Sequence, residues 1–276
     1  MTATKLITHR VEKLWGRRDL PEMFGSPAAD EDPVGEIWFQ HPSGNEPELL
    51  VKYLFTSERL SIQVHPDDAA AQAAGYPRGK DEAWVVISAE PDAEIGIGLK
   101  EAVPREALRA AALDGSIEDL MDWRRGRVGD VYYSHAGTVH ALGAGLGVIE
   151  VQQNVDLTYR LYDYGRPREL HLDEGIAVSN PVPFGSPAES QVEEEGRLVL
   201  AKERAFVLER WTGPRSGNLG AGQFWLIPVS GEATVDSEAL EPGTVWIGEE
   251  GTHISVSAGA DLLVAYRGEF LERPLR

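Results

Sequence analysis

Four side chains of the kinds that bind metal ions are spaced so that they could meet at one point. Gln63 and His65 lie two residues apart in an alternating apolar segment, and alternate residues of a strand point to the same face. Glu82 begins a later apolar segment, and His140 closes a glycine-containing turn. Two imidazoles, a carboxylate and an amide oxygen suit Zn²⁺, or alternatively Mn²⁺ or Fe²⁺, with substrate or water as a fifth ligand. Spacing alone also fits histidines that simply pack in a core.

Short strands are expected to carry these side chains. The 276 residues include 29 glycines and 17 prolines, which favours many short strands over long helices. Strands are predicted at residues 34–39, 49–54, 60–65, 84–87, 95–99, 128–133 and 147–152, and again from about 198 onward. We therefore predict a mainly β protein built from antiparallel sandwich or jelly-roll sheets.

The predicted elements divide the chain into an earlier and a later part. We expect a metal-bearing domain over residues 1–180, with a small helical insert at about 100–125. A polar stretch at 181–196, rich in proline, serine and glutamate, predicts a linker or exposed loop. Residues 197–276 are expected to form a second, cupin-like β domain without metal ligands.

The composition excludes several classes of partner and chemistry. The formal net charge is −19, which disfavours nucleic acids and anionic membranes as partners. The densest basic cluster, Arg124, Arg125 and Arg127, is expected at the solvated end of the helical insert. The absence of cysteine excludes disulfides, thiolate ligands and a cysteine nucleophile. No apolar run predicts a signal peptide or a membrane span, so we expect a cytoplasmic protein. We expect the chain to be a monomer or a homodimer.

Four ordered motifs resemble those of the type I mannose-6-phosphate isomerases of the cupin superfamily, in their short bacterial form. They are LSIQVHP at 60–66, GKDEAW at 79–84, AGTVHA at 136–141 and EVQQNVDLTYRLYDY at 150–164. The resemblance covers roughly residues 10–180 well and the rest loosely. It implies a double-stranded β-helix, or cupin jelly roll, with two barrel-like units and one divalent ion per chain, Zn²⁺ in the first place.

The resemblance also implies a role for each residue of the site. The implied metal ligands are Gln63, His65, Glu82 and His140. The implied catalytic residues are Arg160, Lys80, Glu150 and Asp156, and the implied substrate-binding residues are Ser61, Lys80 and Arg160. Two positions depart from the family pattern. Gly79 stands where some longer members carry a histidine proposed for ring opening, and His135 stands where the turn usually has proline.

The implied function is a metal-dependent aldose–ketose isomerase that interconverts mannose 6-phosphate and fructose 6-phosphate through a cis-enediol. The metal would polarise or orient the sugar oxygens. Arg160, which stays charged, would stabilise the enediolate or bind the phosphate, and Lys80 would pair with phosphate or transfer protons. Whether Glu150 or Asp156 carries the proton stays open, since either could instead partner a basic side chain.

Two other functions fit part of the same pattern. A non-catalytic cupin that binds a sugar phosphate as a sensor would keep the metal without turnover, but the joint presence of Arg160, Asp156 and Lys80 argues against it. A cupin enzyme of different chemistry, such as a metal-dependent dioxygenase, usually has a histidine-rich ligand set, which Gln63 fits poorly.

Overall fold

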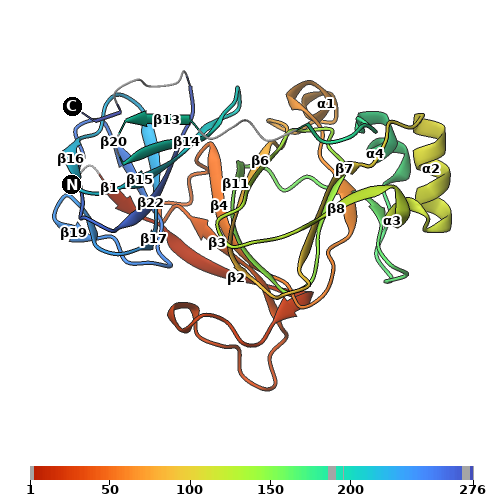
Figure 1. The fold of residues 1–276 in the computed structure, drawn as a ribbon, viewed down its shortest axis with the longest axis horizontal. Helices are drawn as coiled ribbons and strands as arrows, with labels where there is room; N and C mark the ends of the chain where they lie inside the picture. Colours follow the sequence, from red (N-terminus) through yellow and green to blue (C-terminus); the bar gives the residue numbers. More distant parts are fainter. Residues whose placement is uncertain (1–2, 186–190, 195, 269–273, 276) are drawn as a thin grey trace.

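A computed structural model describes residues 3–185, 191–194, 196–268 and 274–275 of the chain. The described residues form four β-sheets whose named strands pair antiparallel, in agreement with the predicted mainly β fold (Figure 1). The sheets fall into two pairs, one from the earlier part of the chain and one chiefly from the later part. Within these described ranges, no helix is long and apolar enough to cross a membrane.

The earlier pair holds a six-stranded and a five-stranded sheet. The six-stranded sheet has the order β2 (Ile7–Arg17), β3 (Val34–Gln40), β4 (Leu49–Phe55), β11 (Leu146–Gln153), β6 (Glu82–Ala89) and β9 (Val131–Ser134). The five-stranded sheet has the order β12 (Tyr159–Tyr162), β5 (Ile62–Val64), β10 (His140–Leu142), β7 (Glu94–Leu99) and β8 (Met121–Arg125).

The later pair holds a seven-stranded and a four-stranded sheet. The seven-stranded sheet has the order β1 (Ala3–Lys5), β20 (Trp246–Glu249), β17 (Gln223–Ser230), β22 (Asp261–Tyr266), β15 (Val207–Thr212), β14 (Arg197–Lys202) and β13 (Gln191–Glu194). The four-stranded sheet has the order β16 (Arg215–Asn218), β21 (His253–Val256), β18 (Ala233–Val235) and β19 (Glu238–Ala239). The first strand of the chain, β1, therefore belongs to the later pair of sheets.

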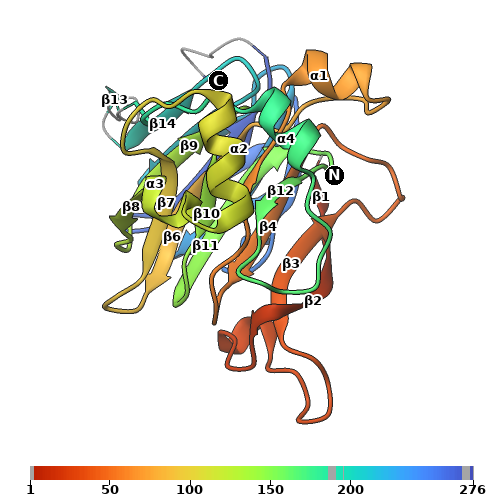
Figure 2. The same cartoon turned by 90° about the vertical axis from the view of Figure 1, so that its right-hand side faces the viewer.

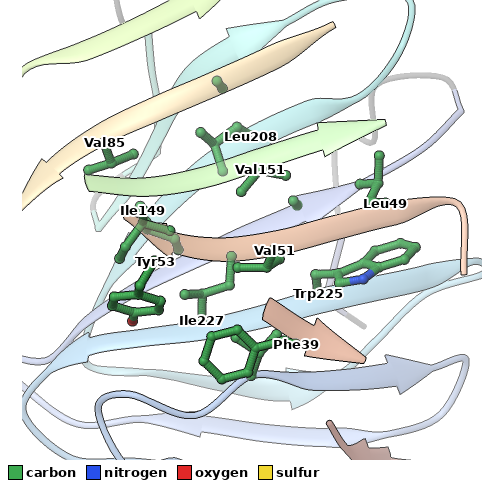
Figure 3. Packing of buried hydrophobic residues seen from close by; sticks show 14 of the residues in the cluster. Phe39, Leu49, Val51, Tyr53, Val85, Ile149, Val151, Leu208, Trp225 and Ile227 are labelled. Carbon is green, nitrogen blue, oxygen red and sulfur yellow. The ribbon is translucent and has the colours of Figure 1, made fainter. Parts of the chain in front are cut away.

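The largest hydrophobic cluster lies between the six-stranded and the seven-stranded sheet. Leu49, Val51 and Tyr53 of β4 pack there against residues of β15 and β17 such as Leu208 and Trp225 (Figure 3). Because side chains alternate along a strand, the intervening residues of β4 point to the opposite face, toward the five-stranded sheet. Strand β4 is thus buried on both faces, and its face toward the five-stranded sheet can contribute to a site.

Helices cover the outer face of the five-stranded sheet. They are α2 (Arg105–Asp114), α3 (Ile117–Leu120) and α4 (Leu172–Val178) (Figure 2). The short helix α1 (Asp68–Ala73) adds Ala71 to the same hydrophobic cluster, and the 3₁₀ turn η1 (Glu22–Phe24) belongs to the cluster on the other side of the six-stranded sheet. Helix α2 begins after Pro104 and ends before Gly115, whose φ of 88° is readily adopted only by glycine. Leu108 and Ile117 are fully buried against the sheet.

Two segments differ from the sequence-based expectation. The helical insert ends at Leu120, because residues 121–125 pair with β7 as the edge strand β8. The prediction that Arg124 and Arg125 lie at a helix end is therefore wrong, and they pair instead with Asp122 and Asp92.

The structure describes part of the expected linker at 181–196. Val182 accepts a hydrogen bond from the backbone of Leu99, so the chain after Asn180 follows β7. Gln191–Glu194 forms strand β13 and pairs with β14. The remainder of the expected linker, residues 186–190 and 195, lies outside the described residues.

Candidate metal centre and adjoining cavity

Two rows of side chains face each other between the six-stranded and the five-stranded sheet. In the five-stranded sheet, Gln63 of β5 pairs with both Arg160 of β12 and His140 of β10, so the three side chains share one face. In the six-stranded sheet, the facing row runs across four strands and consists of Trp38, Lys52, Glu150 and Trp84. The sequence motifs thus meet because antiparallel pairing aligns them.

A buried cluster of His65, Glu82 and His140 lies beside these rows. His65 follows β5, Glu82 begins β6, and the three side chains offer ligand atoms that all lie within 4.8 Å of one another. Nε2 of His65 is 3.4 Å from Oε2 of Glu82, and Nε2 of His140 is 3.1 Å from Oε1. This part of the predicted ligand set is brought together as expected.

Both imidazoles are oriented for metal binding. Nδ1 of His65 donates to the carbonyl oxygen of Leu157 at 2.9 Å, and Nδ1 of His140 donates to that of Thr138 at 2.9 Å. Because a carbonyl only accepts, each Nδ1 carries a proton, and each Nε2 keeps a lone pair within 3.4 Å of an oxygen of Glu82. Burial lowers the pKa of His65 to about 3 and also lowers the pKa of His140, so both rings are neutral.

Glu82 has an unsatisfied oxygen at the centre of the cluster. Its Oε1 is buried and has no hydrogen-bond donor among the described residues. Burial opposes the charge of this carboxylate, but Lys80, His65 and His140 together outweigh that effect and lower the pKa of Glu82 well below its usual value. A negative oxygen without a donor, next to two imidazole lone pairs, fits a divalent cation.

Lys80 completes the buried charges of the centre. Its Nζ donates to Oε2 of Glu82 at 2.8 Å and lies 3.2 Å from Nε2 of His65. Burial opposes the ammonium charge, yet the carboxylates of Glu82 and Glu150 raise the pKa of Lys80 above its ordinary value. Lys80 is therefore a cation at neutral pH.

Gln63 lies next to the cluster, but its amide nitrogen rather than its amide oxygen faces His140. Its Nε2 is 3.3 Å from Nε2 of His140, and its Oε1 accepts a hydrogen bond from Ser61 at 3.2 Å. A half-turn about the last side-chain bond would exchange the two amide atoms. Gln63 as the fourth ligand therefore stays a prediction.

A cavity of about 240 Å³ adjoins the cluster. Every predicted site residue except His65 and Glu82 lines it, namely Ser61, Gln63, Lys80, His140, Glu150, Asp156 and Arg160. The two exceptions are buried behind the wall and contact Lys80 and His140. The structure thus gathers all of the predicted site residues around one cavity.

The two candidate acid–base carboxylates lie in different environments. Glu150 is buried, with Oε1 accepting from Nε1 of Trp84 at 3.0 Å and Oε2 lying 3.3 Å from Nζ of Lys52. Asp156 is exposed at the cavity wall. Among the described residues, neither carboxylate forms an ion pair with Arg160 or Lys80. The basic partner of Glu150 is instead Lys52.

Several residues of the cavity were not anticipated from the sequence. They include the cations Lys13, Lys52 and Arg168, together with Glu36 and Trp38. A signal existed for Lys52, since it is the one charged residue of the fully buried strand Leu49–Phe55. A charged side chain in such a strand requires a partner inside the protein, and therefore marks a polar interior.

The two departures from the family pattern have separate explanations. A Cβ atom at Gly79 would lie 2.4 Å from the backbone carbon of Asp67, so this backbone admits no side chain there. His135 is exposed, does not line the cavity, and lies 3.2 Å from Glu203 of the later part of the chain. Neither position takes part in the centre.

Curated proteins are similar to this chain in sequence. No family model matches the sequence. "Mannose-6-phosphate isomerase" from Streptococcus mutans is 38% identical over 196 residues, 65% of this chain and 61% of that protein. "Mannose-6-phosphate isomerase ManA" from Bacillus subtilis is 39% identical over 158 residues, 52% of this chain and 50% of that protein. The chain thus spans between half and two thirds of these two relatives.

A third relative and a solved structure extend the similarity. YvyI from Bacillus subtilis, whose name also refers to mannose-6-phosphate isomerase, is 34% identical over 242 residues, 72% of this chain and 76% of its own length. The crystal structure of the mannose 6-phosphate isomerase from Bacillus subtilis superimposes with a TM-score of 0.83 and 27% identity, covering 96% of this chain and 99% of that one. Over the described residues, fold and site define a four-sheet β protein with a buried His–Glu–His cluster that could hold a metal ion. The chain belongs to the mannose-6-phosphate isomerase family.

Proposed function

We propose that this chain is a metal-dependent aldose–ketose isomerase that interconverts mannose 6-phosphate and fructose 6-phosphate. The observation that carries the proposal is the His65–Glu82–His140 cluster beside a cavity that also holds Glu150 and Arg160. Membership of the isomerase family supports the same reaction. A phosphorylated sugar is a metabolite of the cell interior, so we expect the enzyme to work in the cytoplasm.

The metal of this centre is proposed to be Zn²⁺, with one ion per chain. His65, Glu82 and His140 would hold it through two nitrogens and one oxygen, and Gln63 would add its amide oxygen. When bound, the ion supplies Lewis-acid polarisation of the sugar oxygens. The fold expected around it is the cupin jelly roll.

The protein's own residues would move the proton between C1 and C2 of the open-chain sugar. A base removes the proton from C2 of the aldose, the electron pair forms the C1–C2 double bond, and negative charge develops on O1. Return of the proton to C1, with transfer of the O2 proton to O1, then gives the ketose. Glu150 is better placed for this transfer than Asp156, because it is buried in the cavity wall and its Oε2 lies 3.3 Å from Nζ of Lys52, whereas Asp156 is exposed.

Arg160 is proposed to stabilise negative charge in the same cavity. Its Nη1 donates to the backbone oxygen of Glu169 at 2.6 Å, which fixes the guanidinium from behind. The fixed positive charge favours an enediolate or a phosphate oxygen over neutral groups.

A coupled assay tests the proposal in both directions. Metal-replete protein should convert fructose 6-phosphate to mannose 6-phosphate and the reverse, and Glu150→Gln should lose most of this turnover while keeping its metal. Absence of turnover in the wild type would contradict the proposal. Binding of the sugar phosphate without turnover would indicate the sensor instead.

A further inference from the structure

The cations around the cavity fall into two groups that differ in their charge balance. Each lysine has a carboxylate: Lys13 lies 3.3 Å from Glu36, Lys52 lies 3.3 Å from Glu150, and Lys80 lies 2.8 Å from Glu82. The other group consists of the arginines Arg160 and Arg168. Arg160 forms no ion pair among the described residues, and Arg168 shares the carboxylate of Asp163 with Arg166, so these arginines are less fully neutralised than the lysines.

Arg168 is held in place by Asp163 in the loop between β12 and α4. Its Nε and Nη2 donate to the two oxygens of Asp163 at 2.6 and 2.7 Å, a two-point contact that fixes the plane of the guanidinium. Asp163 also pairs with Arg166 at 2.8 Å, so a single buried carboxylate serves two guanidinium groups. For Nη1 of Arg168, the described part of the chain supplies no hydrogen-bond acceptor.

The positive charge of Arg160 is less neutralised by carboxylates than that of Arg168. It forms no ion pair within the part of the chain that the structure describes, and its buried Nε has no hydrogen-bond partner. Burial, and then the charge of Arg168, lower the pKa of Arg160 from its ordinary value. Both arginines line the same cavity, so an anion bound between them would relieve their mutual repulsion.

We infer that Arg168, positioned by Asp163, binds the phosphate group of the substrate together with Arg160 and so selects phosphorylated over neutral sugars. The inference rests on the proposed function for the identity of the substrate. A phosphate carries two negative charges near neutral pH and accepts two parallel hydrogen bonds from a guanidinium. Lys80, for which the sequence leaves phosphate pairing and proton transfer open, is occupied by Glu82 and His65.

Arg166 provides a matched control in the same loop. It contacts the same carboxylate, Asp163, but does not line the cavity. Arg168→Gln should raise the KM for mannose 6-phosphate about 10- to 100-fold with kcat within about threefold, whereas Arg166→Gln should change neither by more than about threefold. Arg168→Lys, which keeps the charge without the two-point geometry, should fall between wild type and Arg168→Gln.

Binding of inorganic phosphate, measured by calorimetry, tests the site without turnover. Wild type and Arg166→Gln should bind phosphate, and Arg168→Gln should bind it at least about tenfold more weakly, with an unchanged melting temperature as the folding control. Equal phosphate affinity and equal KM in Arg168→Gln would overturn the inference, as would a fall in kcat alone. If the wild type binds phosphate through Arg168 but isomerises no hexose phosphate, the proposed function fails and the anion site stands.

Discussion

Lys80 and Glu82 form a buried ion pair at the start of β6, with Nζ of the lysine 2.8 Å from Oε2 of the glutamate. Nε2 of His65 lies 3.4 Å from the same oxygen. The lysine therefore neutralises the carboxylate from the side opposite to Oε1, which faces His140. Because a buried carboxylate without a counter-charge costs several kcal/mol, this pair keeps the fold stable when no cation occupies the cluster.

Removal of the metal should consequently leave the wild-type protein folded, whereas Lys80→Met should make the fold depend on metal. Without Lys80, the metal-free variant buries the charge of Glu82 unpaired and should lose about 3–5 kcal/mol in its free energy of unfolding. Urea denaturation with chelator and with added Zn²⁺ measures the difference. The exposed Lys100→Met is the control, and equal destabilisation of Lys80→Met with and without metal would contradict the argument.

The ligand assignment predicts separate effects on metal content and on activity. His140→Ala should lose bound metal, with an affinity at least about 100-fold weaker, because it removes one of the three clustered ligand atoms. Arg160→Ala should keep its metal, because the side chain of Arg160 lies outside the cluster. It should lose activity, because it removes the positive charge proposed to stabilise the enediolate or bind the phosphate. Metal analysis of the purified variants decides the point, and stoichiometric metal in His140→Ala would refute the assignment.

The site could be predicted largely from the sequence because its residues lie in short motifs at strand ends. Gln63 and His65 share one strand segment, and Lys80 and Glu82 share another. Arg168 could not be found in this way, since its place depends on how the loop after β12 folds around Asp163. Where a residue reaches the site through the shape of a loop or through pairing across two sheets, the neighbouring sequence contains no pattern that predicts it.

The fold could be predicted where apolar residues are consecutive, and less well elsewhere. Strand β4 is buried on both faces and is conspicuous as an apolar run. Strand β2, Ile7–Arg17, escaped prediction because its first half is exposed and charged, and it becomes a strand by pairing with β3. Strand β8 is similarly determined by β7 rather than by its own sequence, which is rich in arginine. Local propensity does not predict such strands, because they form by pairing with segments that are distant in the sequence.

Glu36 should stabilise the protein in a pH-dependent way. Burial opposes its charge, but Lys52 and Lys13 outweigh this effect and lower the pKa of Glu36 below its usual 4.5. A group whose pKa is lower in the folded state stabilises the fold above its unfolded pKa, and this stabilisation disappears as the pH falls through the folded pKa. Glu36→Gln should therefore lose about 1–3 kcal/mol at pH 7 and much less at pH 3.

Urea denaturation of both proteins at the two pH values checks this prediction. Glu12→Gln, at an exposed position of the neighbouring strand β2, is the matched control and should change the free energy of unfolding by less than about 0.5 kcal/mol. A difference between wild type and Glu36→Gln that stays constant with pH would exclude the ion pairs as its cause.

Two buried tryptophans separate the effect of an indole hydrogen bond from that of packing. Trp84 donates its Nε1 proton to Glu150 at 3.0 Å, whereas Nε1 of Trp225 is buried without a partner in the described part of the chain. Both side chains are 1% exposed, so phenylalanine removes similar packing at each position. Trp84→Phe should therefore cost about 1.5–3 kcal/mol more than Trp225→Phe, the contribution of a hydrogen bond to a charged group.

The same pair of variants also distinguishes stability from activity. Trp84→Phe leaves the Glu150 carboxylate held by Lys52 alone, and the resulting freedom should lower turnover by about tenfold or more, since misplaced acid–base groups lose efficiency steeply. Trp225 lies between the six-stranded and seven-stranded sheets, away from the cavity, so Trp225→Phe should keep its turnover. Parallel losses of activity in both variants would mean that Trp84 acts through the stability of the fold and does not position Glu150.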